Sequence, residues 1–255
     1  MIGLKLGLVS ATFRQLTAEQ IIDIAAKNAM QAIEWSADKH VVAGDLDKAC
    51  KVKELCDKNN LEIVTYGSYF KVGESLEPEK EFGAVVATAK KLGVHNIRVW
   101  AGSVASSKAD DVCLKKFLEQ ARFAADMAAQ QGMQISFEYH LNTLMDNYIS
   151  VIGLFGTFKR DNIYLNWQPN QTSSLIYNVY ELKMLLPYIS NVHVFYRSPS
   201  NECEQLIEGK DDWAQYIKVL AGKERAFLLE FVKDNSVQVM ETDYALLKEI
   251  AGVRQ

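Results

Sequence analysis

This sequence has little of what marks a disulfide-built or nucleic-acid-binding protein. Its 255 residues include four cysteines, and none of them forms a C-x-x-C pair, so we expect reduced, structural thiols. The chain holds 28 Lys and Arg against 32 Asp and Glu, a net charge of −4. This slight acidity leaves no basic surface for a polyanion such as DNA, and we expect no nucleic-acid partner.

Long apolar runs are also missing. No stretch approaches the roughly 18 apolar residues of a membrane-spanning helix. Residues 1–6 lack the apolar region and the small-residue cleavage site of a signal peptide. We therefore expect a soluble, cytoplasmic protein with no membrane partner.

What the chain does contain is enough apolar sequence for one large core. Hydrophobic residues make up 49% of it, and its length is about that of one α/β barrel. No shift in composition divides the chain. Residues 1–255 are therefore predicted to form a single domain.

Short strand-like runs alternate with longer amphipathic segments, which is typical of a parallel βα architecture. The strand-like runs are residues 4–10, 32–35, 61–66, 96–100, 134–138, 163–166, 192–195 and 226–231. The clearest helical patterns are at residues 18–28, 115–131, 174–189 and 244–251. Eight strands favour a (β/α)8 TIM barrel. The alternative is an open doubly wound sheet, but no G-x-G-x-x-G follows the first strand.

Local signals support these boundaries. Thr17-x-x-Gln20 is a capping-box pattern, which satisfies free amides in the first turn of a helix. Gly93 and Gly132 each stand just before a predicted strand, where a preceding helix should end in a left-handed residue. The capping box therefore marks the start of the helix at residues 18–28, and Gly132 marks the end of the helix at residues 115–131.

Four polar side chains lie at the ends of the later strands. Glu138 ends the fifth strand, Gln168 follows the sixth, His193 lies in the seventh and Glu230 in the eighth. The carboxyl ends of barrel strands converge on one mouth, so these side chains are expected to meet. An unpaired carboxylate in an apolar strand costs several kcal/mol, which favours a functional role for both glutamates over a structural one.

Two carboxylates, an imidazole and an amide oxygen form a hard, oxygen-rich site. Such a site suits one divalent ion, Mn²⁺, Mg²⁺, Co²⁺ or Zn²⁺, better than a soft metal. The ion would polarise a carbonyl, and a carboxylate on each side of the substrate could remove and return a proton. That proton transfer through an enediolate is the chemistry of a sugar isomerase or epimerase.

The chain resembles the xylose-isomerase-like TIM barrels of the sugar phosphate isomerase/epimerase group over nearly its whole length. This group includes ketose 3-epimerases, hydroxypyruvate isomerase and, more distantly, endonuclease IV. The matching strings are Ile33-Glu34-Trp35, Tyr66-Gly67-Ser68-Tyr69, Ile97-Arg98-Val99-Trp100-Ala101-Gly102, Phe137-Glu138-Tyr139-His140 with Thr143, Val192-His193-Val194-Phe195, Glu208-Gly209 before Trp213, and Leu229-Glu230-Phe231-Val232. The resemblance implies that Glu138, Gln168, His193 and Glu230 bind one metal. It also implies that Glu138 and Glu230 are the catalytic acid and base.

The sixth strand departs from this resemblance. The family usually has Asp-x-x-His there, whereas this chain has Gln168-Pro169-Asn170-Gln171. An amide in place of a carboxylate removes one negative charge, so metal affinity should fall, although an amide oxygen can still coordinate a hard cation. The alternative function is therefore a catalytically silent carbohydrate-binding barrel with a degraded metal site at Gln168 and Gln171.

Other side chains near the strand ends are candidates for substrate contacts. These candidates are His40, Tyr66, Trp100, His140, Gln171, Arg197 and Lys233. The aromatic rings could stack on a sugar or simply pack. His140 could equally cap a loop, and Glu34 could bind a hydroxyl or pair internally. Arg197 and Lys233 could meet a phosphate or carboxylate or remain solvated charges. The connection at residues 198–212 could be a lid or a surface loop.

The expected partners are a small-molecule sugar and a second copy of the chain, since barrels with large apolar helical faces often pair. A phosphodiesterase of the endonuclease IV type needs several zinc ions and many histidine ligands. Four histidines and an acidic surface argue against it. The sequence leaves the sugar, its phosphorylation and the choice between isomerisation and epimerisation open.

Overall fold

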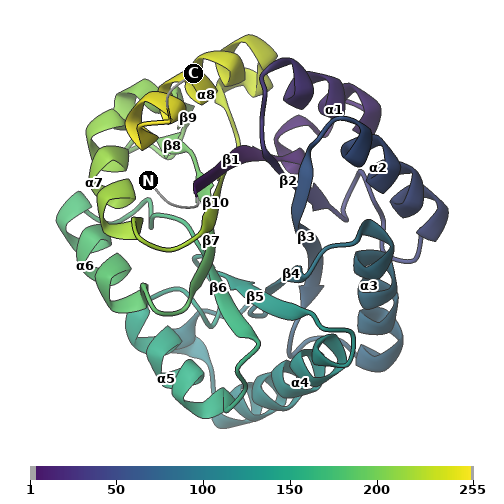
Figure 1. The fold of residues 1–255 in the computed structure, drawn as a ribbon. Coiled ribbons are helices and arrows are strands. Elements are labelled where there is room, and N and C mark those ends of the chain that lie inside the picture. The colour runs from purple at the N-terminus through teal and green to yellow at the C-terminus, as the bar shows by residue number, and fades with distance from the viewer. Residues whose placement is uncertain (1–3, 254–255) are drawn as a thin grey trace.

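The protein is a closed barrel of eight parallel strands surrounded by eight helices, as a computed structural model of residues 4–253 shows (Figure 1). The strands follow one another around the barrel in the order β1-β2-β3-β4-β5-β6-β7-β10, and β10 pairs with β1 to close it. The predicted (β/α)8 TIM barrel is confirmed. Residues 1–3 and 254–255 of the predicted domain lie outside the described part of the chain.

The strands occupy the expected places with small changes at their ends. They are β1 (Leu4–Val9), β2 (Ala32–Ser36), β3 (Glu62–Lys71), β4 (Asn96–Trp100), β5 (Gln134–Glu138), β6 (Ile163–Trp167), β7 (Ile189–Val194) and β10 (Arg225–Leu229). β4 and β5 match the prediction residue for residue. β3 runs five residues further than expected, with a register shift against β4 between Gly67 and Lys71.

The helices form an outer ring around the barrel (Figure 1). They are α1 (Ala18–Lys27), α2 (Leu46–Lys58), α3 (Pro78–Leu92), α4 (Asp111–Ala129), α5 (Tyr148–Phe158), α6 (Leu175–Leu185), α7 (Lys210–Leu220) and α8 (Val237–Ala251). The Thr17–Gln20 capping box is present at the start of α1, with both reciprocal hydrogen bonds. Gly93 ends α3 in the left-handed region at φ 66°, and Gly132 follows α4 at φ 69°.

Apolar strand and helix faces form one extensive core between barrel and ring. Within residues 4–253, no helix combines the length and the apolar composition needed to cross a membrane. The four cysteines are free, and Cys50 and Cys56 share α2 as expected.

The connection at residues 198–212 is ordered. It contains β9 (Cys203–Glu204), which pairs with β8 (Tyr196–Arg197) just before the connection in a small antiparallel hairpin. A 3₁₀ turn at Leu206–Gly209 and the first residues of α7 follow. The sequence analysis did not anticipate this hairpin. It extends β7 beyond the barrel and stands at the mouth, beside the strand ends.

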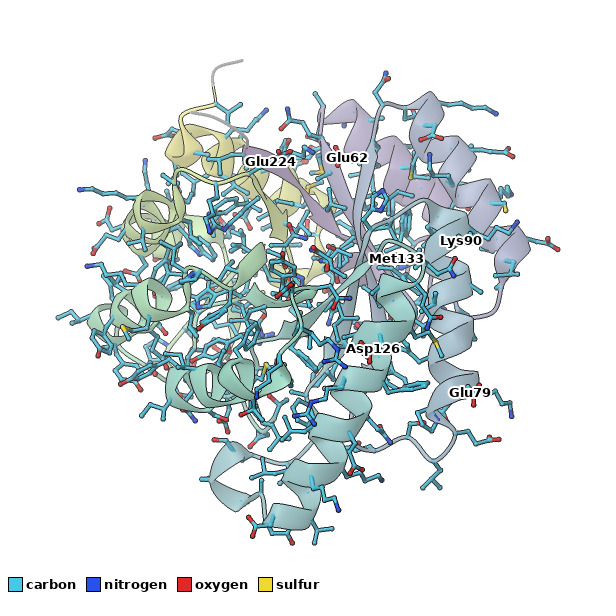
Figure 2. The ribbon with its side chains drawn as sticks, turned by 60° about the horizontal axis from the view of Figure 1, so that its bottom comes forward. Glu62, Glu79, Lys90, Asp126, Met133 and Glu224 are labelled. Carbon is cyan, nitrogen blue, oxygen red and sulfur yellow. The ribbon has the colours of Figure 1, made fainter. Side chains whose placement is uncertain are left out.

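Surface ion pairs lie at the opposite end of the barrel. Lys5 of β1 lies 2.9 Å from Glu62, the first residue of β3, and 2.9 Å from Glu224, which directly precedes β10. Figure 2 shows both glutamates near the same end of the molecule. The catalytic candidates lie at the other end, as the barrel rule requires.

Candidate active site and metal centre

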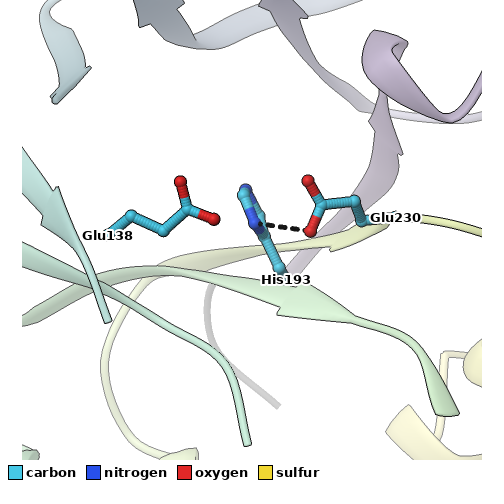
Figure 3. Close-up of side chains that lie close together, drawn as sticks. All are labelled: Glu138, His193 and Glu230. Carbon is cyan, nitrogen blue, oxygen red and sulfur yellow. Dashed lines mark ion pairs between the residues drawn. The ribbon is translucent and has the colours of Figure 1, made fainter. Parts of the chain in front are cut away.

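Three ionisable side chains from distant parts of the chain meet inside the barrel mouth. Glu138 is the last residue of β5, His193 lies within β7 and Glu230 directly follows β10 (Figure 3). One ligand atom from each lies within 4.8 Å of the other two. All three side chains are at most about 4% exposed, so they form a compact, dehydrated centre.

The ring of His193 is oriented by a carboxylate behind it. Its Nε2 lies 3.2 Å from Oε2 of Glu34 in β2, at hydrogen-bonding geometry. Its Nδ1 lies 3.0 Å from Oε2 of Glu230 but makes no hydrogen bond there. If Nε2 donates to Glu34, the Nδ1 lone pair faces Glu138 and Glu230. A carboxylate that fixes the far nitrogen is the usual support of a metal-binding histidine.

Arg98 of β4 connects this centre to Glu34. Its Nε lies 2.7 Å from Oε1 of Glu34, and its Nη1 pairs with Glu138. The guanidinium is 1% exposed and packs 5.4 Å from the ring centroid of Tyr69. The buried cluster thus holds three carboxylates, one guanidinium and one imidazole, and its negative groups outnumber the permanent positive charge.

This imbalance shifts the pKa values of the cluster. Burial would raise the pKa of Glu34, but the charges of Arg98 and His193 outweigh it and lower that pKa to about 2. Burial would lower the pKa of His193, yet the carboxylates of Glu230 and Glu34 raise it to about 10. The centre therefore attracts a positive charge, which either a proton on His193 or a cation can supply.

The two carboxylates closest to His193 differ from one another. Burial raises the pKa of Glu138, and Arg98 offsets only part of that effect. Burial acts on Glu230 in the same direction, but the charge of His193 and its short contact bring the pKa of Glu230 below its usual value. Two carboxylates whose pKa values are shifted in opposite directions are suited to opposite roles in proton transfer.

A cavity of about 370 Å³ opens onto this centre. Glu138 and Glu230 line it together with Gln168, which is 6% exposed, and with His140 and Gln171. Arg197 of β8 lines it too. A second cavity of about 500 Å³ adjoins the first and shares its wall at Pro169, Asn170, Gln171, Thr172, Phe195, Arg197 and Asn201.

The residues present fit a divalent cation. Glu138, His193 and Glu230 provide two carboxylates and one oriented imidazole, a set that hard and borderline ions accept. His193 Nδ1 and Glu230 Oε2 lie 3.0 Å apart, so a cation that replaced the proton between them would meet both atoms. Gln168 lies on the same cavity wall and offers a fourth, neutral oxygen.

Several predicted substrate contacts lie elsewhere. His40 is buried, with Nδ1 3.1 Å from Ser10 Oγ and Nε2 3.2 Å from the Leu16 carbonyl oxygen. Tyr66 donates its hydroxyl to the carbonyl of Val41. Neither residue lines the two cavities at the mouth, because internal polar partners already hold both side chains.

Two other candidates are displaced from the cavity. Trp100 does not line it, and its ring packs 4.8 Å from the ring of His140, behind that residue. Lys233 is held by Glu204 at 2.5 Å. Of the seven predicted substrate contacts, the structure brings His140, Gln171 and Arg197 to the cavity.

Sequence reasoning placed Arg98 and Tyr69 in strings that match the family but did not predict that they join the buried charged cluster. Arg98 carried a usable signal, because a charged residue within the buried run Asn96–Trp100 needs a buried counter-charge as much as Glu138 does. Tyr69 carried none. Its backbone lies in the left-handed region at φ 58°, which turns its ring over Arg98 in a way that strand alternation does not predict.

Known proteins resemble this chain over almost all of its length. The family model for the xylose isomerase-like TIM barrel matches residues 22–250. A 3-dehydroshikimate dehydratase of Bacillus anthracis is 23% identical over 170 residues, covering 64% of this chain and 61% of that protein. The matched part thus spans about three fifths of this curated relative.

Solved structures share the fold. The probable 3-DHS dehydratase involved in petrobactin synthesis from Bacillus anthracis superposes with a TM-score of 0.81 at 20% identity, over 96% of this chain and 98% of that one. A D-psicose 3-epimerase solved in the presence of D-fructose gives 0.74 at 14% identity, over 97% and 99%.

Metal-containing barrels are among the similar structures. One was solved with a zinc atom, with a TM-score of 0.75 at 16% identity, and one from Mycobacterium smegmatis with magnesium, with a TM-score of 0.71 at 13% identity. Each covers 97% of this chain and at least 97% of its own. The family model extends over most of the sequence, and the chain belongs to the xylose isomerase-like TIM barrel family.

Proposed function

We propose that this protein is a divalent-metal-dependent enzyme that moves a proton at a carbon next to a carbonyl of a small polyhydroxylated substrate. Sugar isomerases and epimerases share this step. The observation that carries the proposal is the meeting of Glu138, His193 and Glu230 beside a cavity large enough for a sugar, which Glu138 and Glu230 line.

The residues divide the work as their environments suggest. Glu138, His193 and Glu230 would hold the ion, with Gln168 able to add an amide oxygen. When bound, the ion supplies polarisation of the substrate carbonyl and stabilisation of an enediolate. Glu230, with the lower pKa, is the better candidate to accept a proton, and Glu138, with the higher pKa, to return one.

Arg98 and Glu34 position these groups without touching substrate. Arg98 fixes the carboxylate of Glu138, and Glu34 fixes the imidazole of His193. Both are buried and carry their own compensating charges. Because these groups are already fixed, reorganising them during proton transfer costs little free energy.

A dehydratase is the second candidate, and the likeness to a 3-dehydroshikimate dehydratase favours it. Dehydration next to a carbonyl begins with the same proton removal. The electron pair then forms a carbon–carbon double bond, and the hydroxyl on the neighbouring carbon leaves as water after taking a proton from an acid. The two activities differ in whether the second carboxylate protonates carbon or the departing oxygen.

The test begins with the metal content of the purified protein by elemental mass spectrometry. Metal-loaded protein is then offered D-psicose, D-fructose and 3-dehydroshikimate in D₂O, and products are followed by proton NMR. Epimerase activity would exchange the proton at carbon and interconvert the ketoses, whereas dehydratase activity would release water and leave a new double bond.

Glu138→Gln and Glu230→Gln are each expected to lose at least about a thousandfold in turnover while circular dichroism reports an intact fold. Glu249→Gln, which alters an exposed carboxylate paired with Lys210, is the matched control and should retain full activity. Appreciable turnover in either site variant would contradict the proposal. Sugar binding without metal or turnover in the wild type would favour the catalytically silent barrel.

A further inference from the structure

Arg197 occupies an unusual place at the mouth. It lies in β8 just beyond the end of β7 and lines both adjoining cavities. Its guanidinium is 5.9 Å from the ring centroid of Phe195 and 5.6 Å from that of Phe231. Its Nη1 donates to the carbonyl of Asn201 at 3.1 Å. Two rings and one carbonyl therefore hold the guanidinium in place with most of its donors unused.

Three other cations near the mouth have acidic partners within the protein. Arg14 pairs with Asp38 at 2.6 Å, and Lys233 pairs with Glu204 at 2.5 Å. Arg98 is buried between two glutamates. Among residues 4–253, Arg197 makes no ion pair within 4 Å, and no other Lys or Arg lines the cavity over the catalytic centre. It is a permanent charge without a counter-ion in the part of the chain that the structure describes.

The cavity wall around Arg197 differs in charge from the wall that carries Glu138 and Glu230. Besides Arg197, the wall shared by the two cavities contains only uncharged residues, including Asn170, Gln171, Thr172 and Asn201. Glu138, Glu230 and Asp146 line the first cavity only, and Asp212 lines the second only. An anionic group would be repelled by the two glutamates and attracted by Arg197, so these charges would orient a substrate that carries such a group.

We propose that Arg197 selects substrates that carry an oxyanion, a carboxylate or a phosphate, on the part remote from the reacting carbon. This inference rests on the proposed function for the identity of the reacting end. A planar guanidinium held between two rings presents parallel donors to two oxygens, which a carboxylate or phosphate accepts together. A neutral sugar would leave this charge unpaired.

Matched probes isolate the charge. Shikimate and methyl shikimate differ by one carboxylate, and D-ribulose 5-phosphate and D-ribulose differ by one phosphate. Their binding to the full-length wild-type protein is measured by isothermal titration calorimetry. We expect the charged member of at least one pair to bind about tenfold tighter. The pair with the larger ratio identifies the oxyanion.

The variants test the residue. Arg197→Ala should bring that ratio close to one, and Arg197→Lys should keep part of it, less for a carboxylate than for a phosphate. Arg160→Ala removes an exposed arginine paired with Asp126 far from the cavity, and it should leave the ratio unchanged. Equal binding of charged and neutral probes by the wild type, or an unchanged ratio in Arg197→Ala, would overturn the inference.

This outcome is independent of catalysis. Glu138→Gln should lose turnover and keep the preference for the charged probe, because Arg197 remains. A kept preference together with full turnover in Glu138→Gln would refute the proposed function and leave this inference standing. Normal wild-type turnover with no preference for charge would do the reverse.

Discussion

The two halves of the barrel mouth use similar residues in opposite ways. In the half built from β1 to β4, the charged side chains pair with one another, Arg98 with Glu34 and Arg14 with Asp38. In the half built from β5 to β10, several polar side chains, among them Gln168, Gln171 and Arg197, line a cavity. Every residue that lines the cavity over the catalytic centre falls between positions 138 and 231.

The difference teaches that a charged residue at a strand end can serve either stability or chemistry, depending on whether its partner lies within the protein. The first half has ion pairs of its own, and Arg98 and Glu34 also hold Glu138 and His193 of the second half in place. The second half leaves Gln168 and Arg197 on the cavity wall, with donors of Arg197 free for a ligand. Changes in the first half should therefore affect folding, and changes in the second should affect binding.

The largest effect is expected from a change in the first half. Arg98→Leu leaves Glu34 and Glu138 buried without their shared cation, and loss of one partner of a buried pair costs about 3 to 5 kcal/mol. Urea unfolding followed by circular dichroism measures it. Arg160→Leu, at an exposed pair, should cost less than about 1 kcal/mol. A similarly small loss in Arg98→Leu would remove the distinction between the halves.

Asp243 of α8 is a buried carboxylate in the second half of the barrel. Among residues 4–253 it has no cationic partner, unlike the buried carboxylates that pair with Arg98. It accepts a hydrogen bond from the backbone amide of Leu206 at 2.9 Å. Burial raises the pKa of Asp243 to about 6, against 3.8 when exposed. The folded protein therefore binds this proton more tightly, and stability falls as pH rises from about 4 to about 6.

Asp243→Asn should remove that penalty. We expect the variant to gain about 1 to 2 kcal/mol over the wild type above pH 7, and the gain should vanish near pH 4. Urea titrations at several pH values measure the difference. Asp23→Asn, at an exposed position of α1, is the control. A gain that does not depend on pH would show that titration of Asp243 is not its cause.

Gln168→Asp tests the second half directly. A carboxylate beside Glu138 and Glu230 adds one negative charge to the cavity wall, and ligand charge tunes cation affinity over several decades. Calorimetric titration with Mn²⁺ should give about tenfold or tighter binding than in the wild type. The metal-free variant should be slightly less stable, because like charges repel. Gln168→Asn, which keeps the wall neutral, should show neither the gain nor the loss.

The smallest effect is expected at Tyr69. Tyr69→Phe keeps the ring over Arg98 but removes the hydroxyl that accepts a hydrogen bond from Arg14 at 2.9 Å. This bond is partly exposed, so its loss should cost less than about 1 kcal/mol. Thermal unfolding measures it, with Tyr180→Phe on the exposed face of α6 as the reference. A loss as large as that of Arg98→Leu would mean that the hydroxyl, rather than the ring, supports the cluster.

Most of the fold could be predicted because hydrophobic periodicity, caps and glycines are local signals. β4 and β5 were located residue for residue, and Thr17 and Gln20 formed the expected cap. β3 was predicted too short because Gly67 and Ser68 interrupt its apolar run, and its register against β4 shifts between Gly67 and Lys71. The β8–β9 hairpin is two residues on each side, too short for any periodic pattern.

The candidate site could be predicted only in part. Convergence of Glu138, Gln168, His193 and Glu230 follows from strand order, and these residues lie at the mouth as expected. The substrate contacts depend on side-chain direction, which loops decide. Tyr66 points to a backbone carbonyl, and the left-handed backbone at Tyr69 brings that residue to the cluster instead. No sequence pattern distinguishes these two tyrosines.

Arg98 also connects parts of the chain that are far apart in the sequence. Its two partners lie 64 residues before it and 40 after it, and Glu34 meets His193 across 159 residues. If the chain were cut between β4 and β5, one fragment would hold Glu34 and Arg98, and the other would hold Glu138, His193 and Glu230. Two ion pairs cross that cut, Arg98 with Glu138 and Glu34 with His193. Only association with the complementary fragment restores them, so we expect the two fragments to bind each other in preference to a second copy of either one.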